Sequence, residues 1–549
     1  MSEVCVELVG KLVGEMLGLS KEELSPSDNL ISLGLGSLDI MRIAGLLTKN
    51  GCNVTFSELV SNPCMASWIN FARERSARSS SNGSPLLGSA NYSKGDPFPI
   101  TSVQHAYMVG RRDGQELGGT ACHAYMEFEC GSLDAAKLER AVKLLILRHP
   151  MLRARFSDDG TARIEDKVTW KGLTTYRVEG AGNPDSRIEG IRQELSHLRF
   201  DIEQDDLIDV RLTVVSPKRT IMHINVDLLA ADVLSIQVLL EDLAHLYDGT
   251  DLTPIEISFM EYARRTGIGE DARNEDREYW LNRIDNMPGG PSLPLKAPME
   301  SVKRSQFTRM EYLIDSKSWK NFTEKGRQIG VTQSMGIAAV YAKALSRWSE
   351  DKKFLLNLPL FNRKPIHPDV DKIVSDFTSL ILLEADCANA ISLLELASQM
   401  QGRFQQDVAH SSFGAVEVLR ELSHRCPNDP KKAPVVFASN IGTQFISNKV
   451  EDVFGPLSKM LAETPQVLLD HQIYDHKNGL LLAWDYVSEL LDDKIAKQMF
   501  EAYCTAVRFY CENDWSEPFP DLLPPSQRAA RAEANSCLLY TSPSPRDIS

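Results

Sequence analysis

The chain has no long apolar run and no excess of basic residues, and each absence narrows the range of functions. None of its apolar stretches approaches the roughly 18 residues that cross a bilayer, and Glu3 and Glu7 stand where a secretory signal carries basic residues. Its formal net charge is −15. This charge argues against nucleic-acid binding, which needs a basic surface that displaces counterions from phosphates. We therefore expect protein and small-molecule partners, with no nucleic acid and no membrane.

The chain also lacks the cysteine patterns of a metal site or a disulfide framework. Its 10 cysteines are scattered, without a Cys-x-x-Cys pair or a tight Cys/His cluster at zinc spacing. This pattern predicts no metal and a reduced, cytoplasmic compartment. With 549 residues and 43% hydrophobic content, the chain is long enough for roughly two to four folding units.

The first part of the chain predicts a short helical domain at residues 1–75. Apolar residues recur every four positions in residues 4–17, which indicates the buried stripe of an amphipathic helix. Further helical patterns follow up to about residue 72. Residues 76–95 are rich in Ser, Gly, Asn and Arg without apolar periodicity, as in a flexible linker.

Residues 96–520 mix helical and strand patterns and predict a large α/β domain. The sequence predicts helices at 133–148 and 333–348 and strands at 211–215, 222–226, 354–358 and 480–484. This length exceeds one comfortable core, so we expect two lobes that divide near residues 260–286. Residues 538–549 are rich in Ser and Pro, and we interpret them as a disordered or artefactual tail.

Ser37 follows two glycines at the predicted start of a helix, in the sequence Leu-Gly-Leu-Gly-Ser-Leu at residues 33–38. Unpaired backbone amides and the macrodipole at a helix start stabilise an anionic phosphate. A serine at this position is equally well explained as a helix N-cap. The spacing alone leaves both interpretations open.

The segment around Ser37 resembles the peptidyl or aryl carrier domains, whose signature is L-G-x-x-S-[LI]. The resemblance implies a small all-α four-helix bundle. It also implies 4′-phosphopantetheine as a covalent cofactor on Ser37 and a phosphopantetheinyl transferase as a partner. The Gly-Leu-Gly-Ser-Leu-Asp-Ile-Met-Arg-Ile form at residues 34–43 is similar to aryl carriers of siderophore synthetases.

Five segments of the large domain resemble, in order, the motifs of heterocyclization domains, which belong to the condensation superfamily of nonribosomal peptide synthetases. The third has the Asp-x-x-x-x-Asp-x-x-Ser pattern in place of the His-His-x-x-x-Asp-Gly of ordinary condensation domains. The segments are residues 98–111, 148–154, 227–235, 357–380, and the pair 434–439 and 464–472. The resemblance implies an α/β domain of two chloramphenicol-acetyltransferase-like lobes, with the active site in the tunnel between them.

Three aspartates of these segments are candidate site residues. Asp227 and Asp232 follow an apolar, strand-like run. Such carboxylates are either functional or held in ion pairs, and the residues alone favour the structural interpretation. Asp470 ends the apolar run at residues 467–469. Desolvation there would raise its pKa and let it transfer protons near neutral pH.

The resemblance implies that a carrier-bound acyl group is condensed with a carrier-bound cysteine, serine or threonine. The new amide is then cyclodehydrated to a thiazoline or oxazoline. In the family, the Asp at the position of Asp470 and a Thr in Pro-Val-Val-Phe-Thr-Ser are tied to ring closure. This chain keeps Asp470 and has Ala438 at the Thr position, with Ser439 beside it. The implied catalytic set is Asp470, Ser439, Gln466, Asp227 and Asp232.

Residues 521–537 resemble the linker that precedes an adenylation domain. The expected partners are therefore an acyl-activating adenylation enzyme and downstream adenylation and carrier domains. Two other functions remain open. Ala438 favours a condensation domain that forms the amide without closing the ring. The chain could also be a noncatalytic scaffold that presents the Ser37 arm, although the presence of Asp470, Asp227 and Asp232 argues against this.

Overall fold

The computed structural model describes most of the chain. The described residues are 2–20, 23–49, 52, 54, 56–78, 95–178, 183–266, 270–361, 363–364, 366–425, 431–524, 527–529 and 533. Most of the predicted linker at 76–95 and all of the predicted tail at 538–549 lie outside these ranges. In the described part of the chain, no helix is both long enough and apolar enough to cross a membrane.

The N-terminal region forms a small helical bundle, as the sequence predicts. Its helices are α1 (Ser2–Leu17), α2 (Ser37–Lys49), α3 (Phe56–Ser61) and α4 (Met65–Arg78). Val9, Val13 and Trp68 are fully buried in its core, and the Trp68 indole donates a hydrogen bond to the Leu59 carbonyl at 2.9 Å. Cys52 is disulfide-bonded, a pairing that the scattered cysteine pattern did not indicate.

The first lobe of the α/β domain is built on a five-stranded sheet with the order β12-β2-β7-β6-β5. Its strands are β2 (His123–Cys130), β5 (Thr174–Arg177), β6 (Ile208–Ser216), β7 (Arg219–Asp227) and β12 (Leu457–Glu463). Its helices are α6 (Ala135–Arg148), α7 (Pro184–Ser196) and α8 (Val233–Asp248). A small sheet, β1 (Phe98–Pro99), β4 (Thr161–Ile164) and β3 (Ala154–Ser157), flanks them. The expected helix at 133–148 and strands at 211–215 and 222–226 are therefore confirmed.

The second lobe is built on a six-stranded sheet with the order β10-β9-β11-β13-β14-β8. Its strands are β8 (Phe307–Asp315), β9 (Lys353–Phe361), β10 (Thr378–Asp386), β11 (Val435–Gln444), β13 (Leu469–His476) and β14 (Gly479–Val487). Its helices include α11 (Ser316–Gln328), α12 (Gln333–Trp348), α13 (Leu393–Val408) and α16 (Asp493–Glu512). The expected helix at 333–348 and strands at 354–358 and 480–484 are also confirmed, and so is the two-lobe α/β class.

Strand β12 crosses from the second half of the chain into the sheet of the first lobe. It pairs antiparallel with β2, so that Met460 lies opposite Met126. Glu463 at its end is 1% exposed and accepts a hydrogen bond from the Thr120 hydroxyl at 3.0 Å. The predicted division near 260–286 therefore does not separate the two sheets, because β12 returns to the first one.

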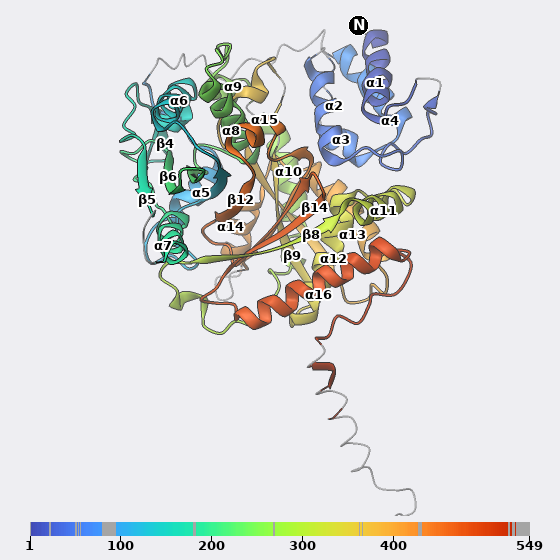
Figure 1. The fold of residues 1–549 in the computed structure, drawn as a ribbon. Helices are drawn as coiled ribbons and strands as arrows, with labels where there is room; N and C mark the ends of the chain where they lie inside the picture. The colour runs from blue at the N-terminus through green and yellow to red at the C-terminus, as the bar shows by residue number, and fades with distance from the viewer. Residues whose placement is uncertain are drawn as a thin grey trace, which may run out of the picture.

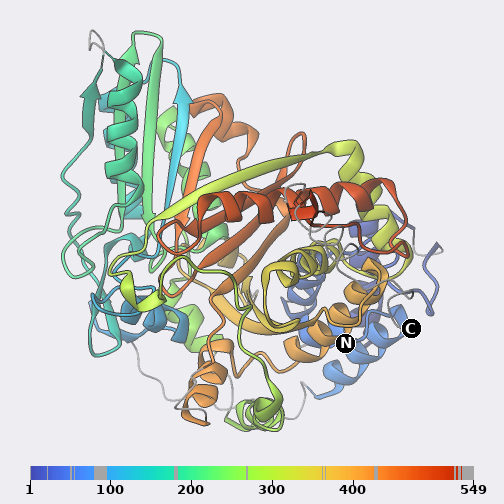
Figure 2. The same ribbon diagram turned by 90° about the horizontal axis from the view of Figure 1, so that it is seen from below.

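Five further α-helices are described. They are α5 (Ser102–Gly110), α9 (Phe259–Thr266), α10 (Glu270–Leu281), α14 (Ala415–Arg425) and α15 (Asn448–Phe454). Figure 1 and Figure 2 both show the N-terminal bundle, in blue, beside the second lobe and away from the sheet of the first lobe. Helix α3 packs against α13, and α2 lies near β11.

Candidate active site

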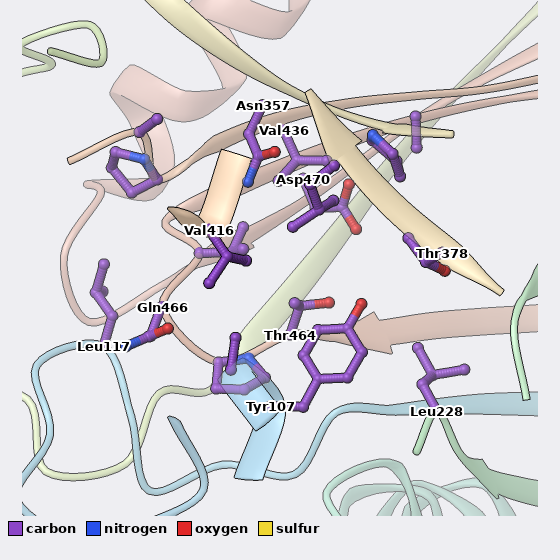
Figure 3. A pocket seen from close by; sticks show the side chains of 18 of the residues that line it. Tyr107, Leu117, Leu228, Asn357, Thr378, Val416, Val436, Thr464, Gln466 and Asp470 are labelled. Carbon is purple, nitrogen blue, oxygen red and sulfur yellow. The ribbon is translucent and has the colours of Figure 1, made fainter. Parts of the chain in front are cut away.

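A cavity of about 510 Å³ lies where the two lobes meet. Residues of α5, β9, β10, β11 and β13 line it, together with the turn at 464–467 that follows β12. Figure 3 shows Tyr107 on one side of this cavity, with Asp470 and Asn357 coming from the strands on the other side. We call this space the interlobe cavity.

Asp470 is the first candidate that the structure places in this cavity. Its side chain extends from β13 and is 5% exposed. Oδ2 accepts a hydrogen bond from the Gln472 amide at 2.5 Å, whereas Oδ1 has no partner among the described residues. Burial, and next the negative charge of Asp485, raise the pKa of Asp470 to about 7. The expected pKa shift of Asp470 is therefore confirmed.

The hydrogen bonds of Gln472 fix the direction of its amide. The Arg309 guanidinium donates to its Oε1 at 3.0 Å, and the Tyr474 hydroxyl donates to the same oxygen. Arg309 is also paired with Asp485, with Nε 2.7 Å from Oδ1. Because two donors occupy Oε1, the NH₂ group of Gln472 faces Asp470. This arrangement holds Oδ2 and leaves Oδ1 available to a molecule in the cavity.

Asp376 is a second buried carboxyl on the wall of the interlobe cavity, and the sequence analysis did not single it out as a site residue. It is 1% exposed and lies just before β10, where its Oδ1 accepts the Thr378 N–H at 3.0 Å. Oδ2 has no partner within the described part of the chain. Burial raises the pKa of Asp376 to about 7, and the nearby Asp232 adds to the shift. The only signal in the sequence for Asp376 was its place in segment 357–380, which resembles a motif of heterocyclization domains.

Tyr107 and Asn357 complete the polar lining. Helix α5 carries Tyr107 and is fixed by a capping box between Thr101 and Gln104. Burial raises the pKa of the Tyr107 hydroxyl well above its usual range. The Asn357 carbonyl oxygen finds no partner among the residues that the structure describes. These groups can donate to or accept from a bound molecule.

Asp227 and Asp232 are held in buried ion pairs. Arg111 contacts Asp227 at 2.6 Å, and Arg363 contacts Asp232 at 2.8 Å. Asp232 also caps helix α8 by accepting the Ser235 N–H at 2.7 Å. These contacts support the structural interpretation, because two buried charges that satisfy each other are not free to transfer protons. Of the two, Asp232 borders the interlobe cavity.

Adjacent residues of β11 face opposite sides of the second sheet. Ala438 lines the interlobe cavity. Ser439 lines a separate narrow cavity of about 60 Å³, where its hydroxyl lies 2.8 Å from that of Ser334. This is the alternation expected of a strand. The structure therefore places Ser439 away from Asp470.

Gln466 lies at the rim of the interlobe cavity. Its side chain is exposed, and its backbone has a φ of 64°. Its N–H donates to the carbonyl of Leu117 at 2.6 Å. Leu117 has a φ of 52° and is the other non-glycine residue with positive φ in the described chain. This strained pair positions the turn that carries Gln466 against the loop after α5.

Strands β9 and β11 are paired over only a short stretch. They pair in parallel at Val436 and Asn357, and beyond this pair Pro359 and Phe361 border both cavities. The narrow cavity and the interlobe cavity therefore share wall residues at the gap between these strands. We call this gap the strand gap.

The N-terminal bundle lies over the outer end of the strand gap. Helix α2 begins at Ser37, and Gly36 and Asp39 line the narrow cavity beside Ser334. The Gly36 N–H donates to the Asp39 carboxylate at 2.9 Å. The contact extends to the loop after α11, where a Cβ built on Gly330 would lie 3.2 Å from the Ser32 hydroxyl. The start of α2 thus lies beside the narrow cavity.

The described residues contain no group of three or more His, Cys, Asp or Glu side chains placed to hold a metal ion. The polar groups of the interlobe cavity include carboxyl, amide and hydroxyl groups, which suit proton transfer and hydrogen bonding to a carbonyl compound.

Comparison with known proteins agrees with this geometry. Residues 98–513 match the condensation domain family, and residues 7–72 match the phosphopantetheine attachment site family. The chain is 34% identical over 543 residues to phenyloxazoline synthase MbtB of Mycobacterium bovis, covering 97% of this chain and 38% of that protein. It is 33% identical over 537 residues to pyochelin synthetase PchE of Pseudomonas aeruginosa, covering 96% of this chain and 37% of that protein. The chain thus spans less than two fifths of these relatives.

A solved structure shows the same fold. The cyclization-docking bidomain of the nonribosomal peptide synthetase EpoB from Sorangium cellulosum is 30% identical. It superposes with a TM-score of 0.70 and covers 77% of this chain and 87% of its own. The family matches agree with the two-lobe fold and the interlobe cavity. The chain belongs to the condensation-domain family of nonribosomal peptide synthetases, and a phosphopantetheine attachment domain precedes its condensation domain.

Proposed function

We propose that this chain condenses an acyl group carried on Ser37 with a carrier-bound cysteine, serine or threonine and closes the product to a thiazoline or oxazoline. The observation that carries the proposal is that the start of α2 borders the narrow cavity, and Pro359 and Phe361 of its wall also line the interlobe cavity that contains Asp470. The relatives named for oxazoline and pyochelin synthesis support the ring-closing reaction.

The residues around Ser37 fit a covalent 4′-phosphopantetheine arm. Ser37 starts a helix, where backbone amides favour a phosphate, and the Ser334 and Ser439 hydroxyls line the adjoining cavity. The arm supplies the acyl group as a reactive thioester. Its attachment needs a phosphopantetheinyl transferase, and its loading needs an acyl-activating adenylation enzyme.

Downstream adenylation and carrier domains would supply the second substrate. We place the chain in the cytoplasm.

The chain's own groups supply the proton transfers that ring closure needs. The side-chain thiol or hydroxyl of the acceptor loses a proton as it adds to the new amide carbonyl, and the amide oxygen leaves as water after gaining protons. Asp470, with its Oδ1 free in the interlobe cavity, is the proposed base. Asp227 and Asp232 hold the cavity walls through their ion pairs, and Gln466 lies at the rim.

A condensation domain that stops at the amide is the second candidate. It is favoured by Ala438, whose methyl group faces the cavity where the family has a threonine hydroxyl. Ser439 does not restore that hydroxyl from its present position, because it faces the narrow cavity.

The first experiment loads Ser37 with an aryl-phosphopantetheine arm and supplies a cysteinyl-loaded carrier protein. Intact-protein mass spectrometry then follows the mass of the acceptor carrier. We expect a product one water lighter than the aryl-cysteinyl amide. An amide that accumulates without loss of water supports the second candidate.

The control is Ser37→Ala, which removes the attachment point while leaving the condensation domain unchanged. We expect no acyl transfer from this variant in cis. If the acceptor carrier stays unmodified with the loaded wild-type chain, both candidate functions are contradicted. The remaining interpretation is then a noncatalytic scaffold that presents the Ser37 arm.

A further inference from the structure

We propose that Asp376 is the second proton-transfer group of ring closure and acts as the acid opposite Asp470. The inference rests on the proposed function and deepens it. Asp376 lines the interlobe cavity, is 1% exposed, and has an Oδ2 without a partner among the described residues. A buried carboxyl oxygen left unpaired on a cavity wall is costly unless a bound molecule satisfies it.

The surroundings of Asp376 hold it in place without neutralising it. Thr378 donates its N–H to Oδ1, and Phe377 donates its N–H to Asp232 at 3.3 Å. Because Arg363 is committed to Asp232, it is not the partner of Asp376. The backbone that carries Asp376 is thus anchored on Asp232, while its Oδ2 is buried without a hydrogen-bond partner in the described chain.

Burial is the main cause of the raised pKa of both carboxyls, and the charged groups around them differ. Asp376 is near the negative Asp232, which disfavours its carboxylate, whereas the hydrogen bonds from Thr378 favour it. Asp470 accepts a hydrogen bond from Gln472 and is near Arg309, both of which favour a carboxylate.

The other groups near Asp470 carry no positive charge. They are Asp485, which is paired with Arg309, and the Tyr341, Tyr474 and Tyr107 side chains. Because Arg309 acts on Asp470 and no cation is among the main influences on Asp376, we assign the base role to Asp470 and the acid role to Asp376.

Tyr107 links the two carboxyls in space. The pKa of its buried hydroxyl is raised by burial first and then by Cys122, Asp376 and Asp470 together. Both carboxyls therefore lie close enough to Tyr107 to act on it. Figure 3 shows the Tyr107 hydroxyl pointing toward the side of the cavity that carries Asp470.

The proposed steps balance in protons and electrons. The acceptor thiol gives its proton to the Asp470 carboxylate as sulfur bonds to the amide carbon, and the carbonyl oxygen takes a proton from the Asp376 acid. In the second step, the nitrogen lone pair forms the C=N bond and the C–O bond breaks. The leaving hydroxyl takes the proton from Asp470, and the nitrogen proton goes to Asp376. One water leaves, and both carboxyls return to their first states.

The test compares Asp376→Asn with wild type in the loaded-carrier assay, across a range of pH. We expect amide formation to continue and ring closure to fall about 100-fold, within the range for loss of a general acid. The wild-type rate of ring closure should be highest near pH 7 and fall on both sides. The variant should lose the fall on the alkaline side, because that fall reports deprotonation of Asp376.

Asp407→Asn is the matched control. Asp407 is a buried aspartate on α13 whose pKa is also raised by burial, and it pairs with Arg283 outside the interlobe cavity. We expect this variant to close rings like wild type. Equal losses of ring closure in Asp407→Asn and Asp376→Asn would overturn the inference.

A preformed aryl-cysteinyl amide on the acceptor carrier separates the two reactions. If Asp376→Asn dehydrates this amide at the wild-type rate with an unchanged pH profile, the inference is wrong, and the proposed function stands. If Asp376→Asn loses dehydration of the preformed amide, the inference is supported even where the variant also slows amide formation. A wild-type chain that makes no ring under any condition contradicts the proposed ring closure itself.

Discussion

At the scale of single residues, the site depends on carboxyls that the fold keeps partly unsatisfied. Asp470 has one oxygen bound by Gln472 and one without a partner in the described chain. Asp232, equally buried, has its charge matched by Arg363. Proton transfer needs a carboxyl with an unpaired oxygen, whereas a rigid wall needs a carboxylate held in an ion pair. The same residue type therefore serves two purposes in this site.

The raised pKa of Asp470 predicts how stability depends on pH. A carboxyl whose pKa is higher in the folded chain than in the unfolded chain stabilises the fold fully below about pH 4 and loses that contribution as pH rises through about 7. Asp470→Asn does not titrate. Its free energy of unfolding should therefore increase relative to wild type by on the order of 2 kcal/mol between about pH 5 and about pH 8. Chemical denaturation at both pH values measures this difference.

Asp251→Asn, at an exposed position, serves as the control for this measurement. Its free energy of unfolding should follow that of wild type at both pH values. A difference between Asp470→Asn and wild type that stays constant with pH would show that the Asp470 carboxyl does not titrate in this range.

At the scale of elements, β11 separates two tasks by strand alternation. Ala438 faces the interlobe cavity, and Ser439 faces the narrow cavity and hydrogen-bonds to Ser334. The pleat explains why a hydroxyl one position along the sequence is on the wrong side of the sheet for ring closure. The side of β11 on which a residue lies therefore decides which cavity its side chain enters.

This alternation predicts opposite outcomes for two substitutions on β11. Ala438→Thr places a hydroxyl in the interlobe cavity and should raise the ratio of ring to open amide about 10-fold. Ser439→Ala removes a hydroxyl from the narrow cavity and should slow both reactions equally, which leaves the ratio unchanged. The ratio is read by mass spectrometry of the acceptor carrier. A fall of the ratio in Ser439→Ala would place that hydroxyl in the dehydration step.

At the scale of the whole molecule, the proposed path of the carrier arm runs from the N-terminal bundle along the second lobe. The bundle packs through α3 on α13 and through α2 near β11, so that the start of α2 lies at the outer end of the strand gap. The two lobes are tied together by β12, which joins the first sheet. The path thus depends on three segments that are distant in sequence.

The packing of the bundle on the second lobe can be tested with a bulky substitution. The Ser32 hydroxyl faces Gly330 across this contact. Ser32→Trp should leave loading of Ser37 unchanged and lower acyl transfer in cis about 10-fold or more, because the larger ring cannot fit between the two surfaces. Ser27→Trp, at an exposed position of the same domain, should behave like wild type. Equal transfer in both variants would show that productive transfer uses another surface.

Much of the fold and part of the site were accessible from the sequence. Apolar periodicity predicts α12 at its observed bounds and places strands within β6, β7, β9 and β14, because local patterns of period 2 and 3.6 record which side of an element is buried. The apolar run before Asp470 likewise predicts its raised pKa.

Only the tertiary structure decided the rest. That β12 belongs to the first sheet depends on pairing between segments far apart in the chain, which no local pattern encodes. The same holds for Asp376, whose free oxygen and negative neighbour Asp232 are brought together from separate segments. The sequence by itself determined the elements, the family motifs and the buried carboxyl at Asp470. Which carboxyls are paired and which face the cavity was decided by long-range packing, because burial and charge pairing arise from neighbours in space.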